Sequence, residues 1–140
     1  MDNVVEVKME NKRKHLEFIQ SVITRMNTNS FMIKGWAVTL VSALSVLAAK
    51  DSNLRFLLVA YMVAPTFWGL DAFYLSQERQ YRDLYNDVKK KQESEIDFSM
   101  DATPYKKGKN TWLCCLAAST VWTLYVTILV IMLLAGFIFS

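Results

Sequence analysis

Few residues of this sequence are suited to covalent or acid–base chemistry. There is one histidine, His15, and there are two cysteines, the adjacent residues Cys114 and Cys115. The sequence has no glycine-rich phosphate loop, no histidines and cysteines spaced as metal ligands, and no Ser-His-Asp set that spacing would group into a catalytic triad. We therefore expect no enzymatic activity, no bound metal and no cofactor.

Two charged residues, Lys34 and Asp71, stand out because each lies within a long apolar run. The runs extend over Phe31–Ala49 and Leu54–Leu75, and the polar residues 50–53 separate them. Counted from this break, Lys34 lies about as far back as Asp71 lies forward, so the two residues share one depth if the runs form an antiparallel hairpin. An ion pair between them would lower the cost of placing an acid near a bilayer. Alternatively, Lys34 extends to the lipid headgroups and Asp71 is unpaired at a hydrated helix end.

The length and composition of the chain predict an all-α integral membrane protein with three transmembrane helices. The 140 residues are 53% hydrophobic, and a run of about 20 apolar residues spans a hydrocarbon core of ~30 Å. A third run, Trp112–Phe139, contains no charged residue. The prediction comprises a tight hairpin at residues 31–75 and a third span at residues 112–140. No signal peptide is visible in the first 30 residues, so the first span is expected to direct insertion.

Lysines and arginines alternate in number between the segments that connect the spans. The N-terminal flank has six, at residues 8, 12, 13, 14, 25 and 34; the hairpin turn has two, at 50 and 55; the next connection has eight, at 79, 82, 89, 90, 91, 106, 107 and 109. None follows the last span. Because cytoplasmic flanks are rich in these residues, we expect a cytoplasmic N-terminus and an external C-terminus. The lysine clusters either contact anionic lipid headgroups or act only as topology determinants. No nucleic-acid binding is expected, because aromatic residues do not interleave the cations.

Two helical extensions are expected on the cytoplasmic side, within residues 1–30 and 76–111. Each has an apolar face, and the two faces are expected to bury each other or to bind a cytosolic protein partner. The faces comprise Leu16, Ile19, Val22, Ile23 and Met26 in the first extension, and Tyr81, Leu84, Tyr85 and Val88 in the second. Residues 1–10 are expected to be loose, residues 27–30 to interrupt the first helix, and residues 93–110 to form a mobile linker.

Two of the predicted spans have hydroxyl side chains at helical spacing. The sets are Thr39, Ser42 and Ser45 in the first span, and Ser119, Thr123 and Thr127 in the third. In lipid, such residues allow helices to approach closely and to form interhelical hydrogen bonds. One interpretation is packing between spans of the same chain; the other is a subunit interface or the wall of a pore.

Four short stretches carry a resemblance to known proteins. They are His15-Leu16-x-Phe18-Ile19-Gln20, Asn29-Ser30-Phe31-x-x-Lys34-Gly35-Trp36, Phe67-Trp68-Gly69-Leu70-Asp71 and Gln77-Glu78-Arg79. Over about residues 15–85 the chain resembles small bacterial membrane proteins that occur beside anti-phage defence genes. Its plan of cytoplasmic helix, tight hairpin and helical extension is similar to that of the SLATT-type membrane effectors, with a third span added.

The resemblance implies a homo-oligomeric bacterial inner-membrane protein that acts as a pore-forming or membrane-perturbing effector in anti-phage defence. In that role the hydroxyl residues would border the conduction path and the cytoplasmic helices would gate it. The alternative is a non-conducting membrane anchor or regulator that holds a cytosolic protein.

Overall fold

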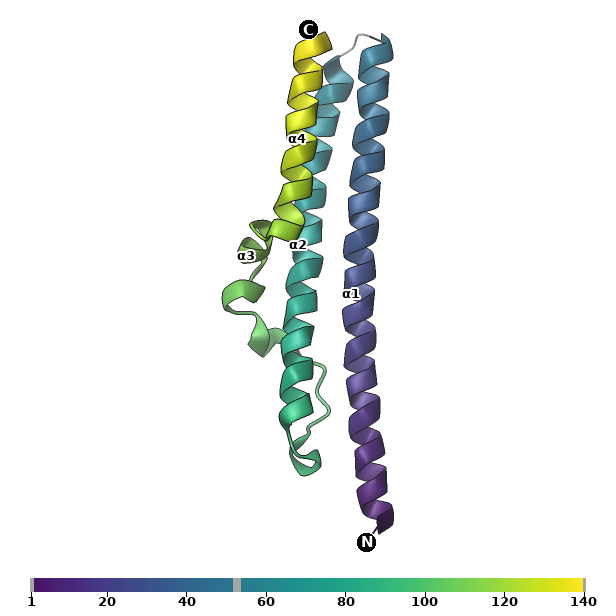
Figure 1. Cartoon of the computed structure of the whole chain (residues 1–140), viewed down its shortest axis with the longest axis vertical. Coiled ribbons are helices and arrows are strands. Elements are labelled where there is room, and N and C mark those ends of the chain that lie inside the picture. The colour runs from purple at the N-terminus through teal and green to yellow at the C-terminus, as the bar shows by residue number, and fades with distance from the viewer. Residues whose placement is uncertain (1, 52–53, 140) are drawn as a thin grey trace.

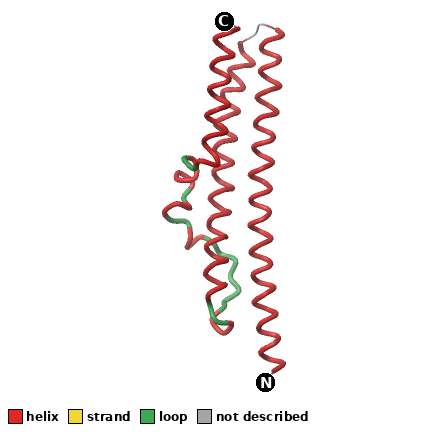
Figure 2. The backbone as a smooth tube through the Cα atoms, in the orientation of Figure 1, coloured by secondary structure: helices red, strands yellow, loops and turns green. Residues whose placement is uncertain are grey.

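The computed structural model describes residues 2–51 and 54–139, and within them it contains helices and loops but no strand (Figure 2). Three helices are long: α1 (Asp2–Asp51), α2 (Leu54–Lys90) and α4 (Ser119–Phe139). The connection between α2 and α4 contains four short elements, namely η1 (Glu93–Glu95), η2 (Thr103–Tyr105), η3 (Gly108–Asn110) and α3 (Trp112–Leu116). The all-helical prediction is confirmed for the described residues.

The long helices form an extended bundle. α1 and α2 lie antiparallel along most of their length, and α4 packs chiefly against α2 (Figure 1). The end of α4 therefore lies beside the end of α1 and the start of α2, and the start of α1 lies at the opposite end of the bundle (Figure 1). Each of the three helices is long and apolar enough to cross a membrane. We call residues 2–30 of α1 and 76–90 of α2 the stalk.

Small residues set the spacing between the helices. Ala37, Ala60, Ala64 and Ala72 are completely buried, which is typical of positions where two helix backbones approach closely. Near the far end of the bundle, a Cβ added to Gly136 of α4 would lie 3.2 Å from a methyl group of Leu57. The helices thus meet through residues that carry little side-chain volume.

The N-terminal helix differs from the prediction. α1 is one uninterrupted helix, so residues 27–30 do not break it and residues 2–10 are helical. The cap-forming residues at 27–30 have no capping role here, because α1 continues to pack against α2 on both sides of them. The Ser30 hydroxyl instead binds a side chain of α2. Ser52 and Asn53, two of the predicted turn residues, lie outside the described residues.

The third apolar run also differs, because it is divided at Ala117 and Ala118. α3 ends there, and the Leu116 carbonyl accepts a hydrogen bond from the Trp68 indole at 3.0 Å. The Trp112 indole donates to the Gly69 carbonyl at 2.9 Å. These two bonds fasten α3 to α2, so the helix long enough to span is α4, whose 21 residues extend about 31 Å.

The segment predicted to be a mobile linker folds back along α2. The Tyr105 hydroxyl donates to Asp87 at 2.8 Å, and Arg79 donates to the Lys109 carbonyl at 2.8 Å. Asn110 is buried and donates to Asp83 at 2.6 Å. These hydrogen bonds to α2 cannot be inferred from the polar composition of the segment. The sequence therefore predicted a mobile linker.

Candidate functional site

The central polar site of the bundle is the Asp71 carboxylate of α2. Asp71 has no exposed surface, and the Lys34 ammonium of α1 donates to its Oδ1 at 2.7 Å and lies 2.6 Å from its Oδ2. The Ser30 hydroxyl donates to Oδ1 at 2.5 Å and accepts a bond from Lys34 at 2.8 Å. The structure thus brings together the two charged residues identified in the apolar runs and adds a serine between them.

These positions follow from helical geometry. Ser30 and Lys34 are one turn apart on α1 and so project on the same face, and that face meets α2 at Asp71. Lys34 is about a quarter exposed, so its ammonium is accessible from one side while the carboxylate is enclosed. Coulomb attraction and hydrogen bonding across these contacts hold the three side chains together.

α4 closes the site from the other side through Tyr125. The Tyr125 side chain is completely buried, and its ring stacks on Trp68 with centroids 6.1 Å apart and planes at 6°. Its hydroxyl has no partner at hydrogen-bonding geometry, and Asp71 is the charged group that it faces. Oδ2 of Asp71 also accepts no hydrogen bond of good geometry. The four side chains therefore join all three long helices at one level of the bundle.

A crevice of about 290 Å³ opens beside this cluster. α1 contributes Asn27, Ser30 and Lys34, α2 contributes Glu78, and α4 contributes Thr120. Glu78 is itself paired with Arg82 at 2.7 Å. Through this crevice, Ser30 and Lys34 of the Asp71 cluster reach the surface between α1 and α4.

The hydroxyl residues of α4 lie on its outer face. Thr123 and Thr127 are each two residues from the buried Tyr125, about 200° around the helix, and both are exposed, as is Ser119. Each threonine hydroxyl donates to a carbonyl of the preceding turn, at 2.6 Å for Thr123 and 2.7 Å for Thr127. This set therefore does not pack against the other helices of its own chain.

The hydroxyl residues of α1 are arranged differently. Thr39 is exposed and donates to the Gly35 carbonyl at 2.9 Å. Ser42 and Ser45 line a groove of about 340 Å³ between α1 and α4, whose other wall includes Ile128 and Met132. The two hydroxyl sets do not meet within one chain.

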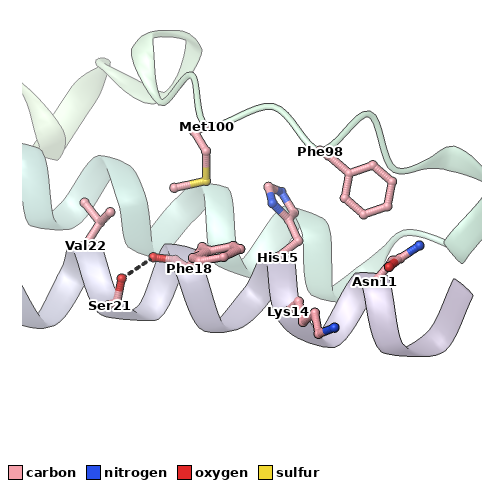
Figure 3. Close-up of a pocket in the computed structure, with 8 residues that line it drawn as sticks. All are labelled: Asn11, Lys14, His15, Phe18, Ser21, Val22, Phe98 and Met100. Carbon is pink, nitrogen blue, oxygen red and sulfur yellow. Dashed lines mark hydrogen bonds between the residues drawn. The ribbon is translucent and has the colours of Figure 1, made fainter. Parts of the chain in front are cut away.

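A second groove, of about 610 Å³, lies in the stalk between α1 and the loop that contains Phe98 (Figure 3). The His15 side chain points from α1 toward this loop, with Phe18 beside it on the helix and Met100 and Phe98 on the loop (Figure 3). The His15 and Phe98 rings meet edge to face with centroids 5.5 Å apart. Phe18 is 65% exposed and Phe98 47%, so the groove presents an aromatic surface to the outside.

His15 is chemically unusual within this groove. Its side chain is buried, and Nε2 has no hydrogen-bond partner among the described residues. Burial lowers the pKa of His15, and the nearby charge of Asp97 opposes that effect only in part. A lowered pKa favours the neutral imidazole, which is consistent with its edge-to-face contact with the ring of Phe98.

The apolar faces of the stalk largely bury each other. Ile19, Ile23, Leu84 and Val88 are buried in one cluster, and Leu16, Tyr81 and Tyr85 pack against it. Val22 lines the groove beside His15 instead, and Met26 is half-buried. Most of the residues considered for binding a cytosolic partner are thus occupied within the chain.

Sequence reasoning did not single out Ser30, Tyr125 or the aromatic pair Phe18 and Phe98 as site residues. Ser30 belongs to residues 27–30, which were expected to interrupt the first helix, although its spacing of four from Lys34 is a usable signal. Tyr125 carries no such signal, since its place opposite Asp71 depends on how α4 packs. Among the described residues, no three His, Cys, Asp or Glu side chains are grouped as a metal site.

No protein-family model, curated protein or solved structure matches this chain.

Proposed function

We propose that the protein spans a membrane three times through α1, α2 and α4. The support is the apolar surface that the chain leaves uncovered: only 17%, 22% and 17% of the most apolar stretches of the three helices is buried. Phe137 is 90% exposed, Phe31 76% and Met62 74%. Such a surface is costly in water at about 25 cal/mol per Å² and is the normal surface of a helix in lipid.

In this arrangement the stalk is cytoplasmic and the C-terminus is external, in a bacterial inner membrane. The cations of the N-terminal flank and of the α2–α4 connection then lie on the cytoplasmic side, as the distribution of lysines and arginines favours. Trp36, Trp68 and Trp112 lie near the level of the Lys34–Asp71 pair, which is where an aromatic belt is expected at the cytoplasmic interface.

We further propose that the protein assembles into a homo-oligomer that forms a pore or perturbs the membrane, consistent with an effector in anti-phage defence. One observation carries this proposal: the hydroxyl residues of α4 face away from the chain's own helices. Ser119, Thr123 and Thr127 are then available to a neighbouring subunit or an aqueous lumen. Because α1 and α2 continue without a break from the stalk into the apolar segments, a movement of the stalk would reach the pore directly.

The test combines assembly and conductance. We expect the purified protein in lipid nanodiscs to have a discrete mass of four or more subunits, and to conduct ions in a planar bilayer. The variant T123L/T127L replaces two outward hydroxyls and should lose conductance while still inserting. T66L is the matched control, because Thr66 is equally exposed on α2 and donates to its own Met62 carbonyl at 2.9 Å. Conductance retained in T123L/T127L would contradict the assignment of these hydroxyls to the wall of the pore.

A second function, a membrane anchor for a cytosolic protein, is favoured by the aromatic groove around His15. Phe18 and Phe98 are the exposed aromatic residues of that groove, and aromatic residues are enriched at protein interfaces. We expect F18A/F98A to release any protein that co-purifies with the wild type, whereas F31A, which changes an exposed aromatic residue outside the stalk, should not. A monomeric or dimeric wild type with no conductance would favour this function over the pore.

A further inference from the structure

The loop that returns from the stalk to α4 brings three exposed lysines toward the predicted cytoplasmic membrane surface. Lys106, Lys107 and Lys109 are all exposed, and none of them forms an ion pair within the described residues. The loop ascends α2 as the sequence advances: Tyr105 bonds to Asp87, and Lys109 is bonded through its carbonyl to Arg79. Lys106, Lys107 and Lys109 therefore lie at the end of the loop that is nearer to the apolar part of α2.

The contacts place these lysines on the scale of the bilayer. Arg79 is four residues below Leu75, the last residue of the second apolar run, so Lys109 lies about 6 Å below that boundary. Headgroups add roughly 5–7 Å to each side of the hydrocarbon core. An extended lysine side chain spans a distance of about the same size between its backbone and its ammonium group. The ammonium of Lys109 thus reaches the headgroup layer, and Lys107 lies one short turn further away.

Directly above the lysines, α3 presents an apolar surface. Leu113 is 70% exposed and Trp112 42%, while the Trp112 indole is fixed by its hydrogen bond to Gly69. An amphipathic ring fixed at the interface beside cations is the usual combination of a surface that contacts headgroups and acyl chains together. The backbone directs this arrangement, because Gly108 between the lysines has a positive φ of 56° that other residues rarely adopt.

The other lysine cluster has a different place. Lys89 and Lys90 are the last residues of α2, at least ~21 Å from Leu75 along the helix axis. At physiological ionic strength the Debye length is about 8 Å, so their attraction to a bilayer surface is screened. Lys91 is also occupied, since it is paired with Asp87 at 2.9 Å. Two clusters that look alike in the sequence thus lie at very different distances from the membrane.

We propose that Lys106, Lys107 and Lys109, together with Trp112 and Leu113, form a docking surface for anionic phospholipid headgroups. This inference rests on the proposed membrane insertion. In this proposal, the returning loop determines the preference for anionic lipid, and the Lys89–Lys91 cluster does not contribute to it. We assign anionic lipid as the ligand because the three lysines have no ion-pair partner among the described residues and lie next to the exposed apolar side chains of α3.

The test uses the full chain reconstituted in phosphatidylcholine bilayers that contain spin-labelled lipid. Electron paramagnetic resonance then measures how strongly labelled phosphatidylglycerol associates with the protein relative to labelled phosphatidylcholine. We expect the wild type to prefer phosphatidylglycerol, and we expect K107Q/K109Q to lower this preference by about fivefold for each of the two lysines that reaches the headgroups. K89Q/K90Q removes the same charge and should leave the preference unchanged. At about 0.5 M salt the wild type should approach K107Q/K109Q.

Two further variants and readouts separate the ways in which the test can fail. K107R/K109R keeps the charge and should keep the preference, so a loss there would point to misfolding of the loop and overturn the assignment. Equal losses in K107Q/K109Q and K89Q/K90Q would also overturn it, because total charge would then decide. If the wild type inserts, as shown by motionally restricted lipid, but has no preference, only this inference fails. If it restricts no lipid at all, the membrane proposal fails with it.

Discussion

Removing the Lys34 charge should destabilise the bundle far more than the geometry of a single ion pair suggests. In K34M the Asp71 carboxylate would remain buried with Ser30 as its hydrogen-bond donor. Leaving a buried charge without its partner costs about 3–5 kcal/mol. Because Lys34 is about a quarter exposed and water can enter from that side, we expect a value near the lower end of this range.

The reverse substitution should be milder. In D71N the Lys34 side chain can turn toward water through its exposed side, so the loss is mainly that of hydrogen bonds, about 1–2 kcal/mol. The double variant K34M/D71N should be about as stable as D71N alone, so the coupling free energy equals the loss in K34M, about 3 kcal/mol. The measurement is unfolding in mixed micelles of rising SDS content, followed by circular dichroism.

The Glu10–Lys14 pair provides the control for this cycle. Its charged atoms are 2.8 Å apart, close to the 2.6 Å of Lys34 and Asp71, but both of its side chains are about half exposed. The same cycle at Glu10 and Lys14 should give no measurable coupling, because solvent screens an exposed pair. Additive losses in K34M and D71N, or equal coupling at the two pairs, would refute the claim that burial of Asp71 makes this contact structurally important.

Three further changes test other parts of the structure. Burial lowers the pKa of His15 in the folded state, so the unfolded state, with a pKa of about 6.5, binds more protons. The free energy of unfolding should therefore fall as pH decreases from 7.5 to 5.5. H15L should weaken this dependence in unfolding measured at several pH values. N110A removes two donated hydrogen bonds of a buried side chain and should cost about 1–3 kcal/mol, measured as faster proteolysis of the returning loop. W68F removes the indole bond to Leu116 and should cost about 1 kcal/mol in the same SDS titration, with near-native helix content.

The sequence predicted the helical class and the shared depth of Lys34 and Asp71, and it left open whether the two side chains form an ion pair. The relative depth of residues in two antiparallel helices follows from the lengths of the apolar runs and from the number of residues between each position and the short turn. The structure places the two charged groups in contact. The helix through residues 27–30 was not predicted, because cap-forming residues act as caps only where the backbone leaves the helix. Packing of α1 against α2 on both sides overrides that local preference.

The position of α4 and of the returning loop could not be predicted in the same way. α4 has an almost uniformly apolar sequence, so periodicity does not show that Tyr125 faces Asp71 while Thr123 and Thr127 face outward. The loop depends on particular hydrogen bonds, such as those of Asn110, and its polar composition is shared by mobile linkers. Interfaces made of small and hydroxyl residues carry little pattern, so contacts within and between chains look alike in one sequence.

The most direct test of the proposed three-span arrangement is the accessibility of two single cysteines on opposite sides of the membrane. In a background of C114A/C115A, the substitutions K50C and S94C place a thiol at the end of α1 and in η1, respectively. The account predicts that a membrane-impermeant maleimide labels K50C in intact cells whose outer membrane is permeabilised, and labels S94C only after lysis. Labelling of S94C before lysis, or protection of both residues in a protein that alkaline extraction releases from the membrane, would contradict it.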